Sequence, residues 1–404
     1  MDVTKDNFGQ ALNEFTAAIG ACDFAALDME MTGLYESREY QPCREDSCDE
    51  RYAKLRRSVE TFGVVQVGIC LFTWKADGDS GFYEAQPFNF NVFPASTVGG
   101  VDAGFSSRAS ALAFLAKNSF DFNKWVYQGI PYLRTSTANS LRTERTRLLT
   151  RRKRSVAPDE RHTKFVADVE CALAAFIKSK EPTLRYELAN SYERKLVYDA
   201  VASHDTLGTR SRMGAIEVFK GSPRAMARHI AHKIKSFNSS VDDAHGFTRV
   251  IDLLSASRKP VIGHNMLLDV LHALQKFVSD LPPSRTQVEH DIAQFLPVLI
   301  DTKYIIESTP GVKARYGTSS LDEIAPVLER EDSASIRFHP RFMRNVSHSM
   351  HEAGYDAYMT GATFIRLLKL DGSIDLAIYK YVNRLYAATA EGIYWDIKPD
   401  KLSI

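Results

Sequence analysis

The strongest constraint on the fold is VVQVGICLF (residues 64–72), a run of apolar, mostly β-branched residues. Such a run is typical of a strand that is covered on both faces. Strands are also expected at DFAALDME (23–30), at FNFNVFP (88–94), which reads as a half-buried strand, and at KPVIGHN (259–265). Helical spacing recurs between these runs, for example at SSRASALAFLAKNSF (106–120). The pattern predicts an α/β domain.

Further helices are expected in the second half of the chain. MLLDVLHALQKF (266–277) has an amphipathic pattern, and FLPVLIDTKYI (295–305) holds another apolar run that ends in an acid. Ser320 and Glu323 form a capping-box pattern. The closing segments, 352–370 and 373–390, both have helical spacing.

The middle of the chain differs in composition from its flanks. Seven basic residues crowd into RTERTRLLTRRKRS (142–155), which is either a linker or a funnel for RNA. The region that follows predicts a small inserted module. The expected domains are residues 1–160 and 246–404, which together form the α/β domain, and residues 161–245, which form the insertion.

Composition limits the function classes. The formal net charge of +1 excludes a strongly basic, histone-like binder. MDVTKDNFGQ shows no secretory signal, and no apolar run is long enough to span a membrane. Five scattered cysteines are typical of a reducing, intracellular compartment. Cys43 and Cys48 lack a second pair at zinc-finger spacing, so a zinc site is the weaker interpretation.

Acidic residues stand at the ends of expected elements. Asp28 and Glu30 end a strand, and residues two apart in a strand project from the same face. Adjacent carboxylates repel each other, and a divalent cation with oxygen ligands relieves that repulsion. The alternative is a solvated strand end. Asp269 lies in an apolar helix, where an unpaired charge is costly to bury; it faces either solvent or the same cation. His264 is interpreted as a turn histidine rather than a ligand.

HEAGYDAYMTG (351–361) offers the remaining groups. Residues five apart on a helix lie about 140° apart around the axis, so His351 is expected in the preceding loop and Asp356 in the helix. Ala353 and Gly354 leave room for close backbone approach. Asp356 would complete the metal site, and His351 would be the general base that takes a proton from water. Four carboxylates and a histidine suit two-metal phosphodiester hydrolysis.

The ordered set D-x-E, D and H-x4-D resembles the DEDD superfamily of 3′-to-5′ exonucleases, in the subgroup with a catalytic histidine. LDMEMTGL, FNFNVFP, FDFNKWVYQGIPYL, VIGHNMLLDVLHALQKF, LIDTK and HEAGYDAYMTG resemble, in the same order, segments of the poly(A)-specific ribonuclease (PARN) family, which includes related piRNA-trimming enzymes. The resemblance covers most of the chain outside the middle module. It implies a ribonuclease H-like fold, in which a mixed central sheet is flanked by helices.

The resemblance also implies roles for individual residues. Asp28, Glu30, Asp269 and Asp356 would bind two Mg²⁺ ions, or Mn²⁺ in their place, and His351 would be the base. Met31, Leu34, Asn265 and Lys303 would contact RNA, with a structural hydrogen bond as the alternative for Asn265 and Lys303. Met31 stands where the family commonly has an aromatic residue.

In this family the insertion is a small α/β R-x-x-x-H domain that binds single-stranded nucleic acid. Here the signature is degenerate, because Tyr198 stands four residues after Arg194 in place of the histidine. A second match, Arg228 to His232, is interpreted as coincidence. The basic helix around it offers either a phosphate-facing stripe or a solvated face, formed by Arg224, Arg228, Lys233 and Lys235.

The resemblance leads to an expected activity. The chain would be a Mg²⁺-dependent 3′-to-5′ exoribonuclease that shortens poly(A) tails and releases 5′-AMP. The alternative is a trimmer of small-RNA 3′ ends without strict adenine specificity. A DNA exonuclease and a non-catalytic RNA-binding scaffold are weaker interpretations. Single-stranded RNA 3′ ends and a second copy in a homodimer are the expected partners, in the nucleus and/or cytoplasm. Neither the C-terminal RNA-recognition domain of longer members nor a membrane anchor is expected within residues 1–404.

Overall fold

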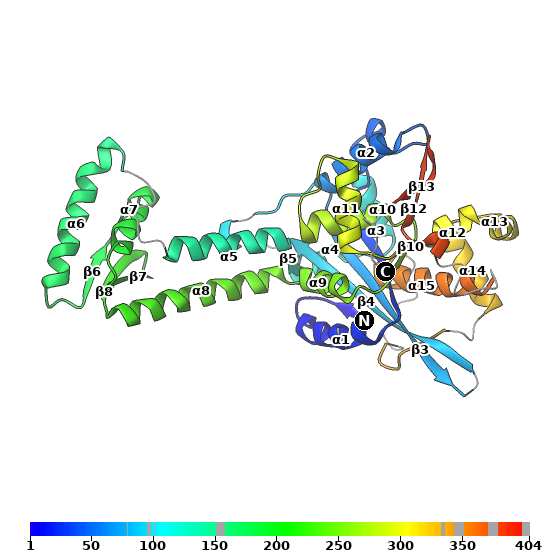
Figure 1. The fold of residues 1–404 in the computed structure, drawn as a ribbon, viewed down its shortest axis with the longest axis horizontal. Coiled ribbons are helices and arrows are strands. Elements are labelled where there is room, and N and C mark those ends of the chain that lie inside the picture. Colours follow the sequence, from blue (N-terminus) through cyan, green and yellow to red (C-terminus); the bar gives the residue numbers. More distant parts are fainter. Residues whose placement is uncertain are drawn as a thin grey trace. The chain divides into compact units, whose positions relative to one another are not determined.

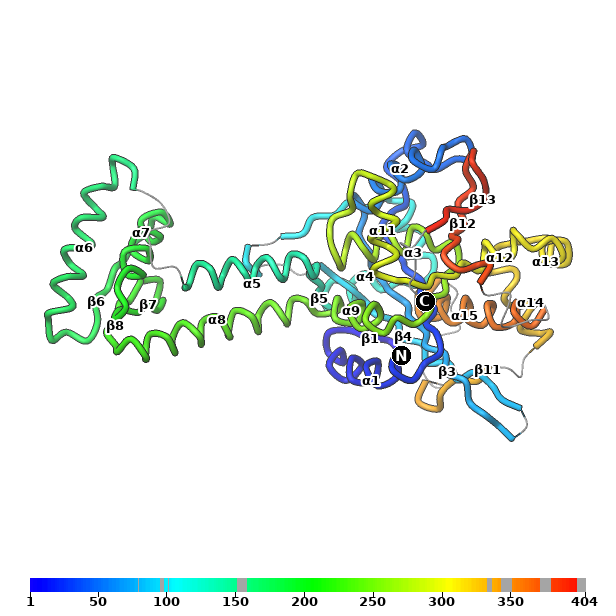
Figure 2. Tube along the Cα trace, viewed as in Figure 1, coloured from blue at the N-terminus to red at the C-terminus, as the bar shows by residue number. Residues whose placement is uncertain are grey.

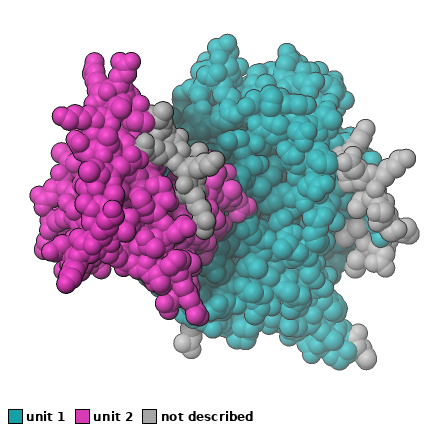
Figure 3. Space-filling view, turned by 60° about the vertical axis from the view of Figure 1, so that its left-hand side comes forward, with its two compact units in different colours: residues 1–137, 244–404 teal, residues 138–243 magenta. Residues whose placement is uncertain are grey.

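The computed structural model describes residues 1–78, 80–94, 98–100, 102–150, 158–332, 336–342, 351–370 and 379–397. The chain divides into two units, coloured separately in Figure 3. Unit 1 contains Met1–Thr137 and Ala244–Ile404, and unit 2 is Ala138–Asp243. Helices α5 (Thr135–Thr150) and α8 (Pro223–His245) carry the chain from unit 1 into unit 2 and back.

Unit 1 is built on one mixed sheet (Figures 1 and 2). Its main strand order is β1-β4-β3-β2-β9-β10, and β5 and β11 also pair with β4. The strands β2, β3 and β4 are antiparallel neighbours, whereas β9 and β10 run parallel to β2. The bounds are β1 (Asp2–Val3), β2 (Phe24–Met31), β3 (Val64–Asp77), β4 (Ser80–Pro94), β5 (Ile130–Tyr132), β9 (Val261–Gly263), β10 (Leu299–Asp301) and β11 (Ile336–Phe338).

Helices cover both faces of this sheet, which confirms the expected mixed sheet flanked by helices. One apolar cluster joins Leu27 and Met29 of β2 to α1, α9 and α10. The other joins Ala26 of β2 to α14 and α15. These helices are α1 (Phe8–Ala21), α9 (Thr248–Ser257), α10 (Leu267–Ala273), α14 (Leu321–Glu331) and α15 (Ala353–Leu370). Because neighbouring residues of β2 enter opposite clusters, the side chains of the strand alternate between the faces.

The remaining elements of unit 1 are shorter or peripheral. A π-helical turn, η4 (Leu274–Val278), continues α10. The others are η1 (Arg38–Tyr40), α2 (Cys48–Thr61), η2 (Val98–Gly100), α3 (Ala109–Lys117), α4 (Phe122–Gln128), α11 (Arg285–Phe295), α12 (Thr302–Ser308), α13 (Pro310–Tyr316), β12 (Arg384–Thr389) and β13 (Gly392–Asp396).

Unit 2 is a small α/β module. Its three antiparallel strands have the order β6-β8-β7, and α6 and α7 share an apolar cluster with them. The elements are η3 (Glu160–His162), α6 (Thr163–Lys178), β6 (Thr183–Tyr186), α7 (Ser191–Ala202), β7 (Leu207–Arg212) and β8 (Ala215–Lys220). The unit has its own core of residues such as Leu173, Val197 and Ile216.

The start of α15 touches the backbone of β3. A Cβ atom added to Gly68 would lie 1.8 Å from the carbonyl oxygen of Ala353, so no larger residue fits at this position. Asn89 of β4 fixes the same point, because its side-chain oxygen accepts a hydrogen bond from the Gly354 N–H at 3.2 Å and its amide donates to Glu352 at 2.9 Å. Gly68 is paired with Asp28 in the sheet, so this contact places α15 beside Asp28.

Three local predictions are wrong. Residues 384–389 of the expected helix 373–390 are a strand, because tertiary pairing with β13 outweighs the helical spacing, and residues 371–378 lie outside the described ranges. FNFNVFP is buried on both faces, since Asn89 and Asn91 hydrogen-bond to neighbouring segments. The Ser320 side chain makes no capping hydrogen bond.

Candidate active site

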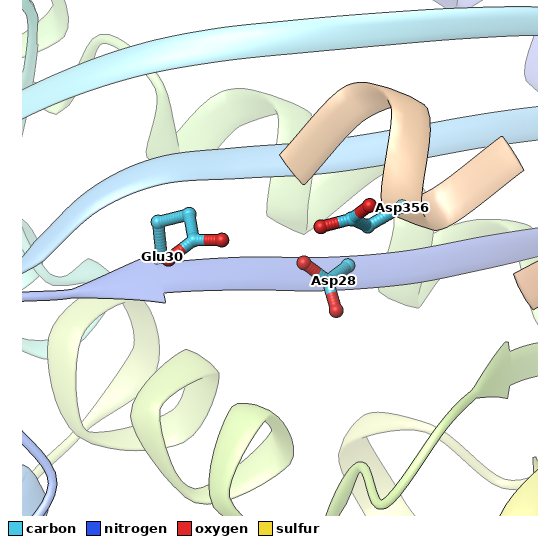
Figure 4. A group of neighbouring side chains, drawn as sticks. All are labelled: Asp28, Glu30 and Asp356. Carbon is cyan, nitrogen blue, oxygen red and sulfur yellow. The ribbon is translucent and has the colours of Figure 1, made fainter. Parts of the chain in front are cut away.

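Three carboxylates meet between β2 and α15. Single carboxylate oxygens of Asp28, Glu30 and Asp356 all lie within 4.8 Å of one another. Figure 4 shows that Asp28 and Glu30 project from the same strand and that the Asp356 carboxylate points towards them from the helix. Since Leu27 and Met29 enter the opposite core, strand alternation puts Asp28 and Glu30 on the α15 face. These three residues are called the acidic cluster below.

His351 lies in the segment before α15, as the helical geometry predicted, and Asp356 lies in the first turn of the helix. The backbone of His351 has φ 67°, and its N–H donates to the Asp356 carboxylate at 3.1 Å. Its ring contacts the edge of the Phe114 ring, with centroids 4.8 Å apart. The Nε2 atom lies 4.0 Å from a carboxylate oxygen of Asp322 at the start of α14. The imidazole therefore lies near an aromatic ring and an acid, and the backbone of His351 joins it to Asp356 of the acidic cluster.

Asp269 lies outside the 4.8 Å group but still acts on it. Strand β9 pairs only with Ala25 and Ala26 of β2, so the later part of that edge of β2 is free to meet α10. The backbone of Met29 hydrogen-bonds to the Asp269 carboxylate, which is buried. The charge of Asp269 contributes to raising the pKa of both Asp28 and Glu30. The fourth predicted acid thus flanks the cluster.

Asp301 ties the surrounding loops together. Its carboxylate is fully buried and accepts backbone N–H groups from Asn265, Met266 and Lys303 at 2.9, 3.1 and 3.0 Å. It also accepts the N–H of Tyr386 in β12 at 3.0 Å. These backbone N–H groups offset part of the cost of burying the carboxylate, although burial still raises the pKa of Asp301. Asp301 therefore fixes the turn before α10, the start of α12 and the β12 strand in one arrangement.

Burial and mutual repulsion oppose the charged forms of the site carboxyls. Burial is the largest cause in each case, although Asp28 and Glu30 keep part of their surfaces accessible. The pKa of Glu30 rises to about 8, that of Asp269 to about 8 and that of Asp356 to about 7, and the pKa of Asp28 is raised well above its usual value. Oxygen ligands held close together in this way fit a hard divalent cation such as Mg²⁺.

The raised pKa values predict a pH-dependent stability of the metal-free protein. The folded state holds protons that the unfolded chain, with carboxyl pKa values near 4, has already released. Stability should therefore fall as pH rises from about 4 to about 8, and the upper part of that range, above about 7, lies beyond the usual histidine pKa of about 6.5. Thermal unfolding in a chelator should show a falling Tm, and Mg²⁺ should reverse the fall. Asp269→Asn should flatten the slope, and a Tm that rises with pH across this window would contradict the prediction.

A cavity of about 340 Å³ opens beside the acidic cluster. It is lined by Met31 and Leu34, two of the four residues predicted to contact RNA, together with Glu30 of the cluster. Phe114 and Leu34 are both substantially exposed in it, at 44% and 54%. The other lining residues are Met29, Gly33, Tyr35, Arg108, Ser110 and Ala111. A mostly apolar wall with an exposed aromatic ring suits stacking of a base.

The structure gives Asn265 and Lys303 mixed surroundings. The backbone N–H groups of both residues donate to Asp301, which is the structural role named as the alternative. The Asn265 side chain is exposed, with φ 59°. The Lys303 ammonium lies over the Tyr386 ring, 4.8 Å from its centroid.

His264 shares a hydrogen bond with the Thr302 hydroxyl at 2.9 Å, and burial lowers the pKa of His264 to about 4. Both observations agree with its interpretation as a turn residue.

Sequence reasoning missed three residues around the site. Asp322 was not singled out in the sequence, yet its charge contributes to raising the pKa of Asp28, Glu30 and Asp356. Phe114 and Arg108 line the cavity, although both lie in or beside a helix far from the acids in sequence. The signal that the sequence offers for Phe114 is a single aromatic residue within the helical segment ASALAFLAK.

In unit 2, the arginine of the degenerate signature has a structural partner. Arg194 donates to the carbonyl oxygens of Leu188 at 3.3 Å and of Gly214, so it ties α7 to the β7–β8 turn. The ammonium of Lys233 donates to Thr209 at 2.6 Å, whereas Arg224, Arg228 and Lys235 are exposed on α8. The proposed basic stripe therefore has three exposed members.

Two further sequence predictions concern a zinc site at Cys43 and Cys48, which was the weaker interpretation, and a membrane-spanning run, which was not expected. Within the described residues, the acidic cluster is the only group of three or more potential ligands, and Cys43 and Cys48 belong to none. The exposed Cys43 thiol instead donates to Asp46 at 3.1 Å. No described helix has the length and apolar character needed to cross a membrane.

A carboxylate cluster with a neighbouring histidine, held on a mixed α/β sheet, has the features of a metal-dependent hydrolase. The comparison with known families identifies the class further. The model of the CAF1 family ribonucleases matches residues 3–364, and the chain therefore belongs to that family.

Individual relatives agree with the resemblance read from the motifs. The chain is 29% identical to the poly(A)-specific ribonuclease PARN of Xenopus laevis, over 92% of this chain and 63% of the relative, and 30% identical to that of Homo sapiens, over 92% and 62%. It thus spans about three fifths of these relatives. The pre-piRNA 3′-exonuclease trimmer of Bombyx mori is 28% identical, over 91% of this chain and 71% of the relative. Among solved structures, S. pombe Pop2p in its Mg²⁺ and Mn²⁺ bound form has a TM-score of 0.49 and 16% identity, covering 96% and 98%.

Proposed function

We propose that the chain is a Mg²⁺-dependent 3′-to-5′ exoribonuclease that shortens poly(A) tails and releases 5′-AMP. The main support for this proposal is the acidic cluster next to His351. Glu30 belongs to this cluster and also lines an apolar cavity. A terminal base in this cavity would place its phosphodiester next to the carboxylates. The names of the PARN relatives and the family of ribonucleases support this substrate.

The residues divide the chemistry between them. Asp28, Glu30 and Asp356, with Asp269 at their flank, would hold two Mg²⁺ ions, or Mn²⁺ in their place. Bound ions of this kind lower the pKa of water and stabilise a leaving oxygen. His351 would accept the proton from the attacking water through its ring, and the nearby Asp322 carboxylate would stabilise the resulting imidazolium. Met31, Leu34 and Phe114 would hold the terminal base.

The alternative function is trimming of small-RNA 3′ ends without strict adenine specificity. One observation favours it: the cavity wall is mostly apolar, and stacking on apolar and aromatic groups tolerates any base. The similarity to the Bombyx mori trimmer supports the same alternative.

We also propose that unit 2, with the exposed Arg224, Arg228 and Lys235, binds single-stranded RNA. Charged residues that track a phosphate backbone are the usual basis of such binding. A homodimer, and action inside the cell in the nucleus and/or cytoplasm, stay predictions.

Two 5′-labelled RNAs with one common body test the function. One ends in oligo(A) and the other in a mixed tail, and the products formed with Mg²⁺ are followed on a denaturing gel. We expect trimming that stops at the tail boundary and that disappears in EDTA. Equal trimming of both RNAs would favour the small-RNA trimmer, and no trimming of either would overturn both proposals.

A further inference from the structure

A second cavity in unit 1 is separate in its lining residues from the acidic cluster. It has a volume of about 290 Å³ and includes Arg134 and Lys276 among its lining residues, with Phe105 and Tyr132 as its aromatic groups. Phe105 keeps 36% of its surface exposed. The cavity thus combines two cations with an accessible aromatic ring.

Of the two cations, Arg134 has an ion-pair partner and Lys276 has none within the described residues. Arg134 forms an ion pair with Asp280, whose carboxylate also accepts a hydrogen bond from Gln275 at 3.1 Å. Lys276 forms no hydrogen bond or ion pair within the described parts of the chain, although Glu60 acts on its charge from a distance. Burial and the neighbouring Arg134 lower the pKa of Lys276 to about 8. A partly buried ammonium next to a second cation is costly without an anion.

The backbone around Lys276 is also unusual. It lies in the π-helical turn η4, between the buried residues Gln275 and Phe277. Single π-helical turns are rare and occur frequently at functional sites. Asp102 lines the same cavity but is exposed, and no ion pair joins it to Lys276 among the described residues.

The second cavity is close to the first along the chain. Phe105 lines the second cavity and Arg108 lines the first, and three residues span at most about 10 Å. The segment between them is held in place, because the Ser106 carbonyl accepts a hydrogen bond from the Thr32 hydroxyl at 2.6 Å. The two cavities are therefore close enough along the chain for one RNA strand to reach both.

We propose that this second cavity binds a backbone phosphate of the RNA upstream of its 3′ end, between the Lys276 ammonium and the Arg134 guanidinium. The inference rests on the proposed exonuclease function. Ammonium and guanidinium groups form charge-assisted hydrogen bonds with phosphate oxygens, and Phe105 offers a surface for the adjoining base. The cavity would hold longer substrates more tightly without taking part in hydrolysis.

The test compares wild type with Lys276→Gln on oligo(A) substrates of increasing length. For a 15-nucleotide substrate, Lys276→Gln should raise KM about tenfold with kcat unchanged. For a trinucleotide, KM should stay the same, because the upstream phosphate is absent. The slope of log KM against log salt should fall by about 0.7, the value for one phosphate contact on a single strand.

Three controls keep the result specific. Lys5→Gln removes the same charge from an exposed position and should change neither KM nor kcat. Lys276→Arg should restore most of the affinity. The Tm of Lys276→Gln should equal or exceed that of wild type, because one of two adjacent cations is lost.

A substrate series with a single neutral methylphosphonate linkage locates the contact. Wild type should lose affinity at one linkage, and Lys276→Gln should lose nothing further at that linkage. If wild type trims RNA and Lys276→Gln behaves like wild type on every substrate, the phosphate site is wrong and the exonuclease proposal stands. If wild type trims no RNA at all, the proposed function and this inference both fail.

Discussion

Asp28→Asn is expected to lower the rate of RNA hydrolysis by at least about 10³-fold, since metal-assisted stabilisation of the transition state is worth several kcal/mol. The substitution keeps the shape of the side chain but removes a negative charge from the centre of the acidic cluster. In the absence of metal its Tm should equal or exceed that of wild type, because Asp28 is repelled by Asp356, Asp269 and Glu30. Initial rates on labelled oligo(A), together with thermal unfolding in EDTA, measure both effects.

Two variants make the result specific. Asp6→Asn removes an acid from an exposed position and should leave rate and Tm unchanged. His351→Ala should lower turnover while Mg²⁺ binding is retained, because the hydrogen bond from His351 to the Asp356 carboxylate comes from the backbone N–H, which alanine keeps. If Asp28→Asn kept wild-type activity, the acidic cluster would not be the catalytic site. If His351→Ala lost turnover and metal binding equally, His351 would be a metal ligand rather than a base.

Asp301→Asn should destabilise the protein by about 3–5 kcal/mol and lower the Tm by roughly 10 °C. The buried carboxylate accepts four backbone N–H groups within 3.1 Å, and an amide has only one oxygen to offer them. Its NH₂ group would also face donors rather than acceptors. Thermal or urea unfolding measures the loss, and amide exchange at Met266 and Tyr386 reports whether the turn before α10 and strand β12 are both released.

The same Asp6→Asn variant is a suitable control for this substitution. Activity of Asp301→Asn should also fall, because Asp269 follows three residues after Met266 and depends on the same turn. A Tm within about one degree of wild type would show that the arrangement of the α10 turn, the start of α12 and strand β12 around Asp301 does not depend on its charge.

The central part of the site was predictable because its signals are local. Alternation along β2 places Asp28 and Glu30 on one face whatever surrounds them, and helical geometry separates His351 from Asp356. The small residues Ala353 and Gly354 indicated a close approach, and the structure shows the partner of that approach to be Gly68. These features depend on a few neighbouring residues.

The remainder depends on contacts between distant segments. Asp322 comes near the cluster only because α14 packs beside α15, and nothing in its own segment indicates this. Residues 384–389 have helical spacing, yet pairing with β13 and the Tyr386–Asp301 hydrogen bond make them a strand. Asn89 and Asn91 look like solvent-facing strand residues, but their partners Asp2, Glu352 and Gly354 lie far away in sequence.

The contact of Gly68 with Ala353 has a consequence for biosynthesis. The acidic cluster combines a strand near the start of the chain with a helix that follows the whole of unit 2. Because chains emerge from the ribosome N-terminal end first, a nascent chain presents Asp28 and Glu30 long before Asp356 is made. The cluster closes only when α15 docks on Gly68, so the messenger RNA under translation meets no complete cluster on the growing chain during most of its synthesis.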